Sequence, residues 1–353
     1  MPTLEITTKL GCSLACRFCP QDRLVKSYPR EAARLLSLDD FGCALNKLPN
    51  HVRVDFSGMA EPWLNPDATA MVELAFENAR KVAIYTTLQG MPAADAAMLI
   101  ERFAGRITPE TPWVIHLPDQ QGNMTGWKPS AAYLDTLARF VALRRDRAPD
   151  GLMLMTMSPE GAVHDALRPV LPETLDPFVA ISRVENLDRG DFSPGALLRQ
   201  VRHEGALMCG STPFFDHNTM LPNGDVVLCC MDYAREHVLG NLLRQDYADL
   251  FKGSEMAAVR GQAMGLGGGE LICRRCHNAV CLSQEGGTHW RPQGDAAWTR
   301  REPARPAVPD VLPAPVGMPR RGPVTSSRLA GLLDWMAGRR DQDERRGRSS
   351  DHR

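Results

Sequence analysis

The sequence lacks a long apolar run, a secretory signal and an excess of charge of one sign. No stretch of its 353 residues approaches the roughly 20 consecutive apolar residues that a membrane-spanning helix needs. The N-terminal segment carries Glu5 and Lys9 and contains no apolar signal core. The net charge is −1, which gives no reason to expect binding to nucleic acid or to an anionic membrane. We therefore expect a cytoplasmic protein whose partners include neither nucleic acid nor membrane.

Cysteine, by contrast, is abundant. The chain has ten cysteines, and a reducing cytosol favours metal ligation or redox chemistry over disulfides for such a set. Nine of the ten fall into two groups, one near the N-terminus and one in the last third of the chain, and Cys43 stands alone. The first group consists of Cys12, Cys16 and Cys19, and the second of Cys209, Cys229, Cys230, Cys273, Cys276 and Cys281.

The first two thirds of the chain read as alternating strands and helices. Helices are predicted to begin near Ser37, Asp67, Pro92 and Ser130, each followed by apolar residues at helical spacing. Strands alternating with helices predict a parallel sheet, and six such units predict an α/β fold with a partial (β/α)6 TIM-like barrel. The six predicted strands span residues 3–8, 52–56, 81–87, 113–117, 152–157 and 178–184.

The pattern changes after about residue 200. Short strands, turns and cysteines follow, with a clear turn signal at Leu221-Pro-Asn-Gly-Asp225. Beyond about residue 285 the composition becomes rich in Pro and Arg, which predicts disorder. We therefore predict a first domain over residues 1–200, a small cysteine-rich domain over 201–285 and a disordered tail over 286–353.

The N-terminal cysteines lie in the loop Gly11-Cys-Ser-Leu-Ala-Cys-Arg-Phe-Cys-Pro20. A loop this short can bring three thiolates to one iron–sulfur cluster, and cubane clusters normally take four. Because no fourth cysteine is near, one iron would stay open to another ligand. The alternatives are a structural zinc loop or a redox-sensing cluster, but zinc prefers four closed ligands and this loop offers three cysteines without histidine.

This CxxxCxxC loop after the first predicted strand resembles the hallmark of the radical S-adenosylmethionine (SAM) superfamily. The resemblance covers about residues 1–186 and implies that Cys12, Cys16 and Cys19 bind a [4Fe–4S] cluster with SAM at the open iron. It also implies that Phe18 packs near the adenine. In that family the reduced cluster cleaves SAM to a 5′-deoxyadenosyl radical, which abstracts hydrogen from substrate. An electron donor such as flavodoxin or ferredoxin would then be a partner.

A second segment, Ser57-Gly-Met-Ala-Glu-Pro62, follows the second predicted strand and resembles the family's GGE motif. The resemblance implies that Gly58, Glu61 and Pro62 help to hold the SAM amino group, since a carboxylate pairs well with an ammonium. Met59 and Ala60 depart from the glycine-rich pattern. Alone, such a segment is more often a simple turn.

Two further strand ends are predicted to contribute to the same site. Thr86, Thr87 and Gln89 follow the third predicted strand and resemble the family's next SAM-contacting turn. His116 and Asp119 lie at the end of the fourth, where strand ends of β/α barrels point into the active site, so that they could contact substrate or the SAM ribose. A structural histidine is the alternative for His116.

The C-terminal cysteines, with Gly224 five residues before Cys229 and the later Cys273-Arg-Arg-Cys276, resemble the SPASM and twitch extensions of radical SAM enzymes. The resemblance implies one auxiliary [4Fe–4S] cluster rather than two, because no cysteine follows Cys281. The predicted ligands are Cys209, Cys229, Cys273 and Cys276, with Cys281 as a competing ligand. A zinc ribbon is the alternative.

Three functions from different classes remain open. The first is oxidation or epimerisation of a small polar molecule such as a sugar or aminocyclitol, with the auxiliary cluster accepting the second electron in an oxidation. The second is modification of a ribosomal peptide. The early position of Cys12 leaves no room for a leader-peptide module before it, which favours a small molecule. The third is a non-catalytic electron-transfer or sensor protein.

An epimerase would need a thiol to return a hydrogen atom to the substrate. The spare thiols that could serve as catalytic residues are Cys230 and Cys43. The alternative for both is a buried, inert thiol.

Overall fold

The protein is described here by a computed structural model. The residues whose placement it describes are 1–17, 19–147, 149–156, 162–171, 203–266, 268–276 and 278–282. The predicted sixth strand at 178–184 and the predicted tail over 286–353 lie outside these residues. Among the described residues, no helix is both long and apolar enough to cross a membrane.

Five parallel strands form the first part of the sheet, in the order β5-β4-β3-β2-β1. Each lies within the span predicted for it or differs from that span by one or two residues, and the predicted α/β fold with a parallel sheet is confirmed. Both the sheet order and the single crossover helices follow from repeated strand–helix units. The strands are β1 (Thr3–Ile6), β2 (Arg53–Phe56), β3 (Val82–Thr86), β4 (Trp113–Leu117) and β5 (Leu152–Thr156).

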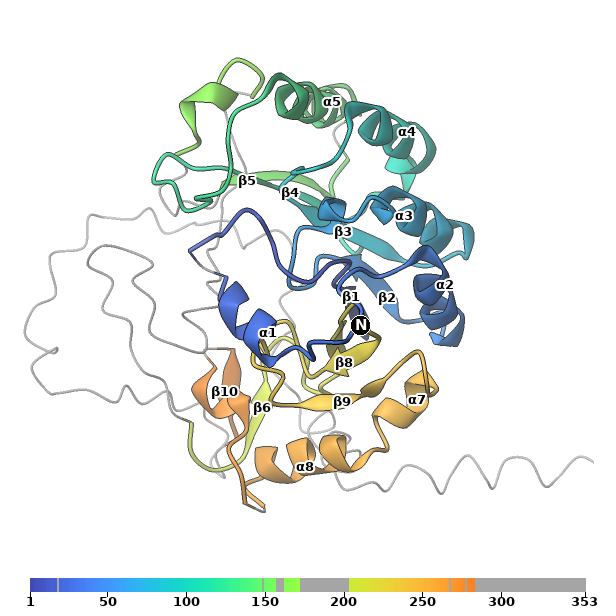
Figure 1. The fold of residues 1–353 in the computed structure, drawn as a ribbon, viewed down its shortest axis with the longest axis vertical. Coiled ribbons are helices and arrows are strands. Elements are labelled where there is room, and N and C mark those ends of the chain that lie inside the picture. Colours follow the sequence, from blue (N-terminus) through green and yellow to red (C-terminus); the bar gives the residue numbers. More distant parts are fainter. Residues whose placement is uncertain are drawn as a thin grey trace, which may run out of the picture.

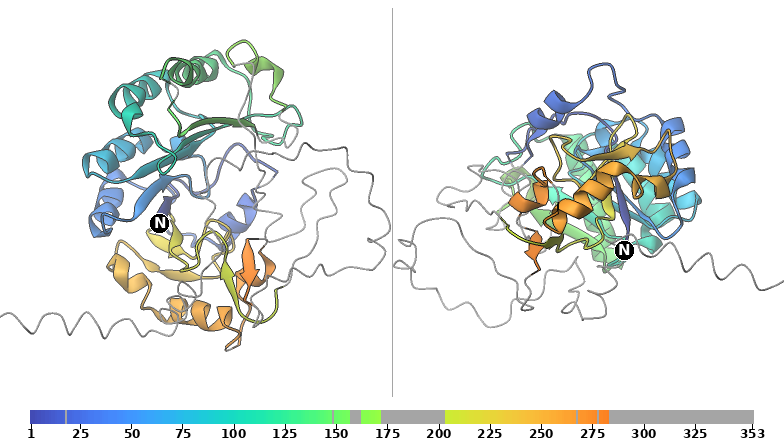
Figure 2. Two further views of the ribbon diagram at one scale, coloured as in Figure 1. Left: turned by 180° about the vertical axis from the view of Figure 1, so that it is seen from behind. Right: turned by 90° about the horizontal axis from the view of Figure 1, so that it is seen from below.

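Helices α2 to α5 line one face of this sheet, and α1 lies on the opposite side (Figures 1 and 2). The Ser37 hydroxyl accepts the Asp40 N–H and so caps α2, and the Ser130 hydroxyl accepts the Tyr133 N–H at the start of α5, as predicted. Alternate strand residues such as Leu4, Val54 and Phe56 are fully buried in the core that includes these helices. The bounds are α1 (Gln21–Ser27), α2 (Leu38–Lys47), α3 (Ala68–Glu77), α4 (Ala93–Phe103) and α5 (Ala131–Arg147), with short 3₁₀ turns η1 (Pro62–Leu64), η2 (Ala104–Arg106) and η3 (Asp165–Leu167).

The cysteine-rich part continues the same sheet instead of forming a separate one. Strand β7 pairs in parallel with β1, and β8 and β9 follow antiparallel, so that the sheet has eight strands in the order β5-β4-β3-β2-β1-β7-β8-β9. The predicted turn Leu221–Asp225 joins β7 to β8. A second, two-stranded sheet pairs β6 with β10. The bounds are β6 (Leu207–Cys209), β7 (His217–Met220), β8 (Asp225–Val227), β9 (Val238–Asn241), α7 (Tyr247–Leu250), α8 (Ser254–Ala263), η4 (Ile272–Arg275) and β10 (Ala279–Cys281).

The sheet face opposite the helices is polar near the start of the strands. Arg53 forms a bidentate ion pair with the buried Asp55, with both N–O distances at 2.6 Å. On the neighbouring strands, Nε2 of His217 lies 2.8 Å from the Glu5 carboxylate. Burial by itself lowers the pKa of His217, but the hydrogen bond to Glu5 and the attraction of Glu5 and Asp55 outweigh burial and raise that pKa above its ordinary value.

This raised pKa predicts a pH-dependent stability difference. The folded-state pKa of His217 lies above the unfolded value of about 6.5, so that its pairing stabilises the fold fully below that pH and is lost as the pH rises through the folded pKa. We expect the free energy of unfolding of the protein to exceed that of a His217→Gln variant most at about pH 6 and less as the pH rises, as measured by urea unfolding. His51→Gln is the control, because His51 is exposed. A difference that grows with pH would contradict the assigned pairing.

Candidate functional site

The loop that carries Cys12, Cys16 and Cys19 follows β1 and ends where α1 begins. Gly11 and Ala15 have positive φ angles of 83° and 45°. These angles turn the chain sharply, so that the cysteines of the loop lie near one another. The loop after β4 holds it from the other side: the N–H of Arg17 donates to the Asn123 carbonyl at 2.9 Å, and the N–H of Gly126 donates to the Leu14 carbonyl at 2.7 Å.

The described thiols of this loop lie close enough to influence one another. Burial, followed by repulsion from Cys19 and Cys12, raises the pKa of Cys16 far above its ordinary value. Burial also raises the pKa of Cys12, although the nearby backbone N–H groups of Leu14 and Glu61 act to lower it. A bound metal would remove this cost because a coordinating thiol is deprotonated outright.

The turn after β2 packs directly on the end of β1. The N–H of Met59 donates to the Thr7 hydroxyl at 3.0 Å, and the Thr8 hydroxyl donates to the Pro62 carbonyl at 2.8 Å. Gly58 has a φ of 56°, and a Cβ at this position would lie 2.5 Å from Oγ1 of Thr7 and 2.7 Å from the Ile6 carbonyl oxygen. Only glycine therefore fits where these two strand ends meet.

Glu61 is a buried carboxylate that connects the ends of β2 and β3. It accepts the Thr86 hydroxyl at 2.6 Å and both the hydroxyl and the N–H of Thr87 at 2.7 Å, and it also accepts the N–H of Trp63. Burial raises the pKa of Glu61, and these hydrogen bonds act in the opposite direction. Among the described residues, no basic side chain is hydrogen-bonded to or paired with this carboxylate, so that an added ammonium group would find a buried anion there.

The structure brings the residues predicted for the first three strand ends together. Pro62 begins η1 directly after Glu61, and Thr87 binds Glu61. His116 is half-buried on β4, where its neighbours Ile115 and Leu117 are fully buried. Phe18 lies outside the described residues.

Asp119 is hydrogen-bonded within its own loop. It is buried, and its carboxylate accepts the N–H of Asn123 at 3.0 Å and the Asn123 side-chain amide at 2.8 Å. Because the Asn123 carbonyl in turn binds Arg17, Asp119 positions the loop that supports the cysteines.

Four of the C-terminal cysteines lie close together, with Cys273 and Cys276 buried and Cys209 and Cys229 half-buried. Burial raises the pKa of the Cys273 thiol, followed by repulsion from Cys209 and Cys276, and it raises the pKa of Cys276 to about 11. Burial and repulsion from Cys230, Cys273 and Cys276 raise the pKa of Cys229 in the same way. In the described part of the chain, no three His, Cys, Asp or Glu side chains are already arranged around one point as ligands of a single ion. A cubane cluster is larger than one ion, so that its thiolates stand further apart.

Cys281 has a different neighbour. It lies on β10 opposite Leu207, and its sulfur is 3.3 Å from Nδ1 of the buried His203. The other ring nitrogen of His203 lies 2.9 Å from the carbonyl oxygen of Cys276. His203 therefore contacts both the Cys281 thiol and the backbone of Cys276.

The two spare thiols occupy unlike places. Cys230 is half-buried and follows Cys229 directly, so that it stays beside the second cysteine group. Cys43 is exposed on α2, in the helical layer outside the sheet (Figure 1). The structure does not bring Cys43 to either cysteine group.

Two residues near the cysteines were not expected from the sequence. His203 contacts Cys281, and the hydroxyl of the fully buried Tyr233 lies 3.9 Å from the sulfur of Cys19. An aromatic residue four positions after Cys229 was the only available signal for Tyr233. No local pattern marks His203.

Comparisons with known proteins agree with the second cysteine group. Residues 209–277 match the SPASM family, described as an iron–sulfur cluster-binding domain, so that the predicted SPASM-type domain is confirmed. No curated protein matches the chain.

Several solved structures resemble the chain weakly. BtrN in complex with AdoMet and 2-DOIA is 14% identical, with 80% of this chain and 94% of that chain covered and a TM-score of 0.46. Native anSMEcpe with bound AdoMet and Kp18Cys peptide is 13% identical, with 78% and 87% covered and a TM-score of 0.44. Streptococcus suis SuiB bound to S-adenosylmethionine is 13% identical, with 78% and 70% covered and a TM-score of 0.40. Similarity at this level does not identify a substrate.

The close contact at Gly58 predicts a large loss of stability on substitution. We expect Gly58→Ala to lower the free energy of unfolding by about 2 kcal/mol or more, because it combines a positive φ with a clash against backbone. Gly42→Ala in α2 is the matched control, since its Cβ would meet only Leu74 at an ordinary 3.5 Å, and helix propensity predicts a gain of about 0.5–1 kcal/mol. Urea unfolding of both variants measures the difference. Equal stability of the two would contradict the described contact.

The different surroundings of Cys281 and Cys273 predict different effects on bound iron. We expect Cys273→Ser to lose iron from the C-terminal site, because Cys273 is buried beside Cys209 and Cys276. We expect Cys281→Ser to keep that iron, because its thiol contacts His203. Iron and sulfide analysis after anaerobic reconstitution measures both. Iron loss in Cys281→Ser alone would make Cys281 the ligand in place of Cys273.

Proposed function

We propose that this chain, whose residues 209–277 match the SPASM family, is a radical SAM enzyme that abstracts hydrogen from a small polar substrate. In this proposal, Cys12, Cys16 and Cys19 hold a [4Fe–4S] cluster with SAM at its open iron. Residues 1–200 form the radical SAM core and 201–285 the auxiliary cluster domain, followed by a tail over 286–353.

The observation that carries the proposal is the meeting of three consecutive strand ends. The Glu61 N–H lies near the Cys12 thiol in the loop after β1, and the Thr7 hydroxyl beside that loop accepts the N–H of Met59 from the turn after β2. Glu61 in turn binds Thr86 and Thr87 after β3. A three-thiol loop and a buried carboxylate thus share one end of a parallel sheet, where ligands of open α/β folds bind.

The residues present fit the proposed cofactors. Coordination to iron would deprotonate the buried thiols, whose pKa is raised by burial. The buried Glu61 carboxylate would pair with the SAM ammonium group. Gly58 lets the turn after β2 approach the loop closely enough for this contact. When bound, the cluster and SAM would supply a 5′-deoxyadenosyl radical, which takes a hydrogen atom from carbon.

A polar substrate is supported by polar side chains at the carboxyl ends of the strands. Glu61 and Thr87 are buried there, and His116 lies half-buried on β4. Charged and hydrogen-bonding side chains recognise hydroxyl and amino groups better than apolar substrates. A sugar or aminocyclitol has this character.

The reaction we propose is oxidation or epimerisation of such a substrate. Oxidation needs an acceptor for a second electron, and an auxiliary [4Fe–4S] cluster held by Cys209, Cys229, Cys273 and Cys276 would provide it. Epimerisation needs a hydrogen donor, for which Cys230 is the spare thiol beside the sites, whereas Cys43 is exposed on α2. An external reductant such as flavodoxin or ferredoxin would reduce the first cluster.

Removing the three N-terminal cysteines tests the proposal. We expect the anaerobically reconstituted protein to hold about eight irons and the combined Cys12→Ala, Cys16→Ala and Cys19→Ala variant to hold about four. SAM cleavage to 5′-deoxyadenosine under reducing conditions should be lost in the variant, because the remaining cluster has no open iron.

Cys43→Ala is the matched control and should keep both iron and SAM cleavage, because Cys43 is exposed on α2. If both sites of the unsubstituted protein take up zinc instead of iron, or if it does not cleave SAM, the proposed function is wrong.

A further inference from the structure

Tyr233 joins the SPASM-matching segment to the N-terminal cysteine loop. It lies four residues after Cys229, its side chain is fully buried, and its hydroxyl is 3.9 Å from the sulfur of Cys19, within reach of a hydrogen bond to sulfur. The ring packs in an apolar cluster with Leu24 and Tyr28 from the α1 region and Met59 from the turn after β2. A residue of the C-terminal half therefore reaches the proposed SAM cluster.

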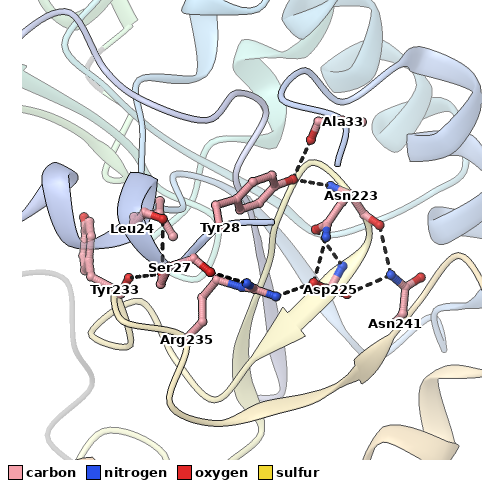
Figure 3. A network of polar contacts seen from close by, with 9 residues as sticks. All are labelled: Leu24, Ser27, Tyr28, Ala33, Asn223, Asp225, Tyr233, Arg235 and Asn241. Carbon is pink, nitrogen blue, oxygen red and sulfur yellow. Dashed lines mark hydrogen bonds and ion pairs between the residues drawn. The ribbon is translucent and has the colours of Figure 1, made fainter. Parts of the chain in front are cut away.

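A network of hydrogen bonds fixes Tyr233 in this place (Figure 3). The Ser27 hydroxyl, at the end of α1, lies 3.2 Å from the Tyr233 carbonyl oxygen. Arg235 donates to the Ser27 carbonyl at 2.6 Å and to the Asp225 carboxylate at 2.6 Å. Arg235 adopts a φ of 55°, a conformation that a non-glycine residue keeps only where its surroundings hold it.

The same network extends to the β7–β8 turn. The Tyr28 hydroxyl donates to the Ala33 carbonyl at 2.5 Å and accepts the N–H of Asn223 at 3.0 Å. Asp225 accepts the side-chain amides of Asn223 and Asn241. These hydrogen bonds attach the end of helix α1, which directly follows the cysteine loop, to the β7–β8 hairpin.

We infer that Tyr233 is a positioning residue that donates a hydrogen bond to the Cys19 thiolate and so raises the reduction potential of the N-terminal cluster. This inference rests on the proposed function. Hydrogen bonds to cluster sulfur are one of the factors that set such potentials. A donor near the thiolate stabilises the more negative, reduced state of the cluster, so that its removal makes reduction harder.

The test is a Tyr233→Phe variant, which keeps the buried ring and removes only the hydroxyl. We expect it to bind the same iron as the unsubstituted protein but to have a more negative midpoint potential for the N-terminal cluster. Reductive titration followed by electron paramagnetic resonance measures this potential, and the N-terminal cluster is recognised as the one whose signal changes when SAM is added. In deuterated water, one exchangeable deuteron coupled to that signal should disappear in Tyr233→Phe.

The matched control is Tyr247→Phe. Tyr247 is a buried tyrosine on α7 whose hydroxyl has no hydrogen-bond partner among the described residues, so that this variant should leave the potential unchanged. Equal potentials in Tyr233→Phe and the unsubstituted protein, with both clusters present, would overturn this inference alone. Absence of the N-terminal cluster from all three proteins would overturn the proposed function and this inference together.

Discussion

The arrangement at the sheet end depends on one buried anion, the Glu61 carboxylate. Burying a charge is costly unless hydrogen bonds or an opposite charge compensate, and Glu61 obtains its compensation from Thr86, Thr87 and the N–H of Trp63. These partners belong to the ends of β2 and β3. Its own N–H lies near the Cys12 thiol after β1. One side chain and its amide therefore set the positions of three strand ends, and a cation arriving at this point would relieve the remaining cost of burial.

The second constraint is the parallel pairing of β7 with β1. The match to the SPASM family begins at Cys209, yet β7, β8 and β9 continue the sheet of the first part. A unit that shares a sheet cannot rotate relative to it without breaking ladder hydrogen bonds. The hydrogen bonds between the end of α1 and the β7–β8 hairpin add a second attachment on the other side of the cysteine loop. The turn that carries Cys229 is thus attached to the same sheet as the N-terminal cysteine loop.

Local patterns allowed much of this to be predicted. Periodicity located the strands β1 to β5, capping residues located α2 and α5, and cysteine spacing located both cysteine groups. The pairing of β7 with β1, the contact of Tyr233 with Cys19 and that of His203 with Cys281 join residues 78 to 214 positions apart, which no local pattern encodes. Asp119 also shows that a residue's position in the sequence does not reveal the partners of its side chain. Its position at a strand end suggested contact with substrate, but its carboxylate is used by the backbone of its own loop.

The segment from Cys229 to Tyr233 explains how the two cysteine groups are connected. Between Cys229 and Tyr233 lies the buried residue Asp232. Its N–H donates to the Cys229 carbonyl, and its carboxylate accepts the N–H groups of Glu236 and His237. One short turn therefore presents Cys229 to the C-terminal group and the Tyr233 hydroxyl to Cys19.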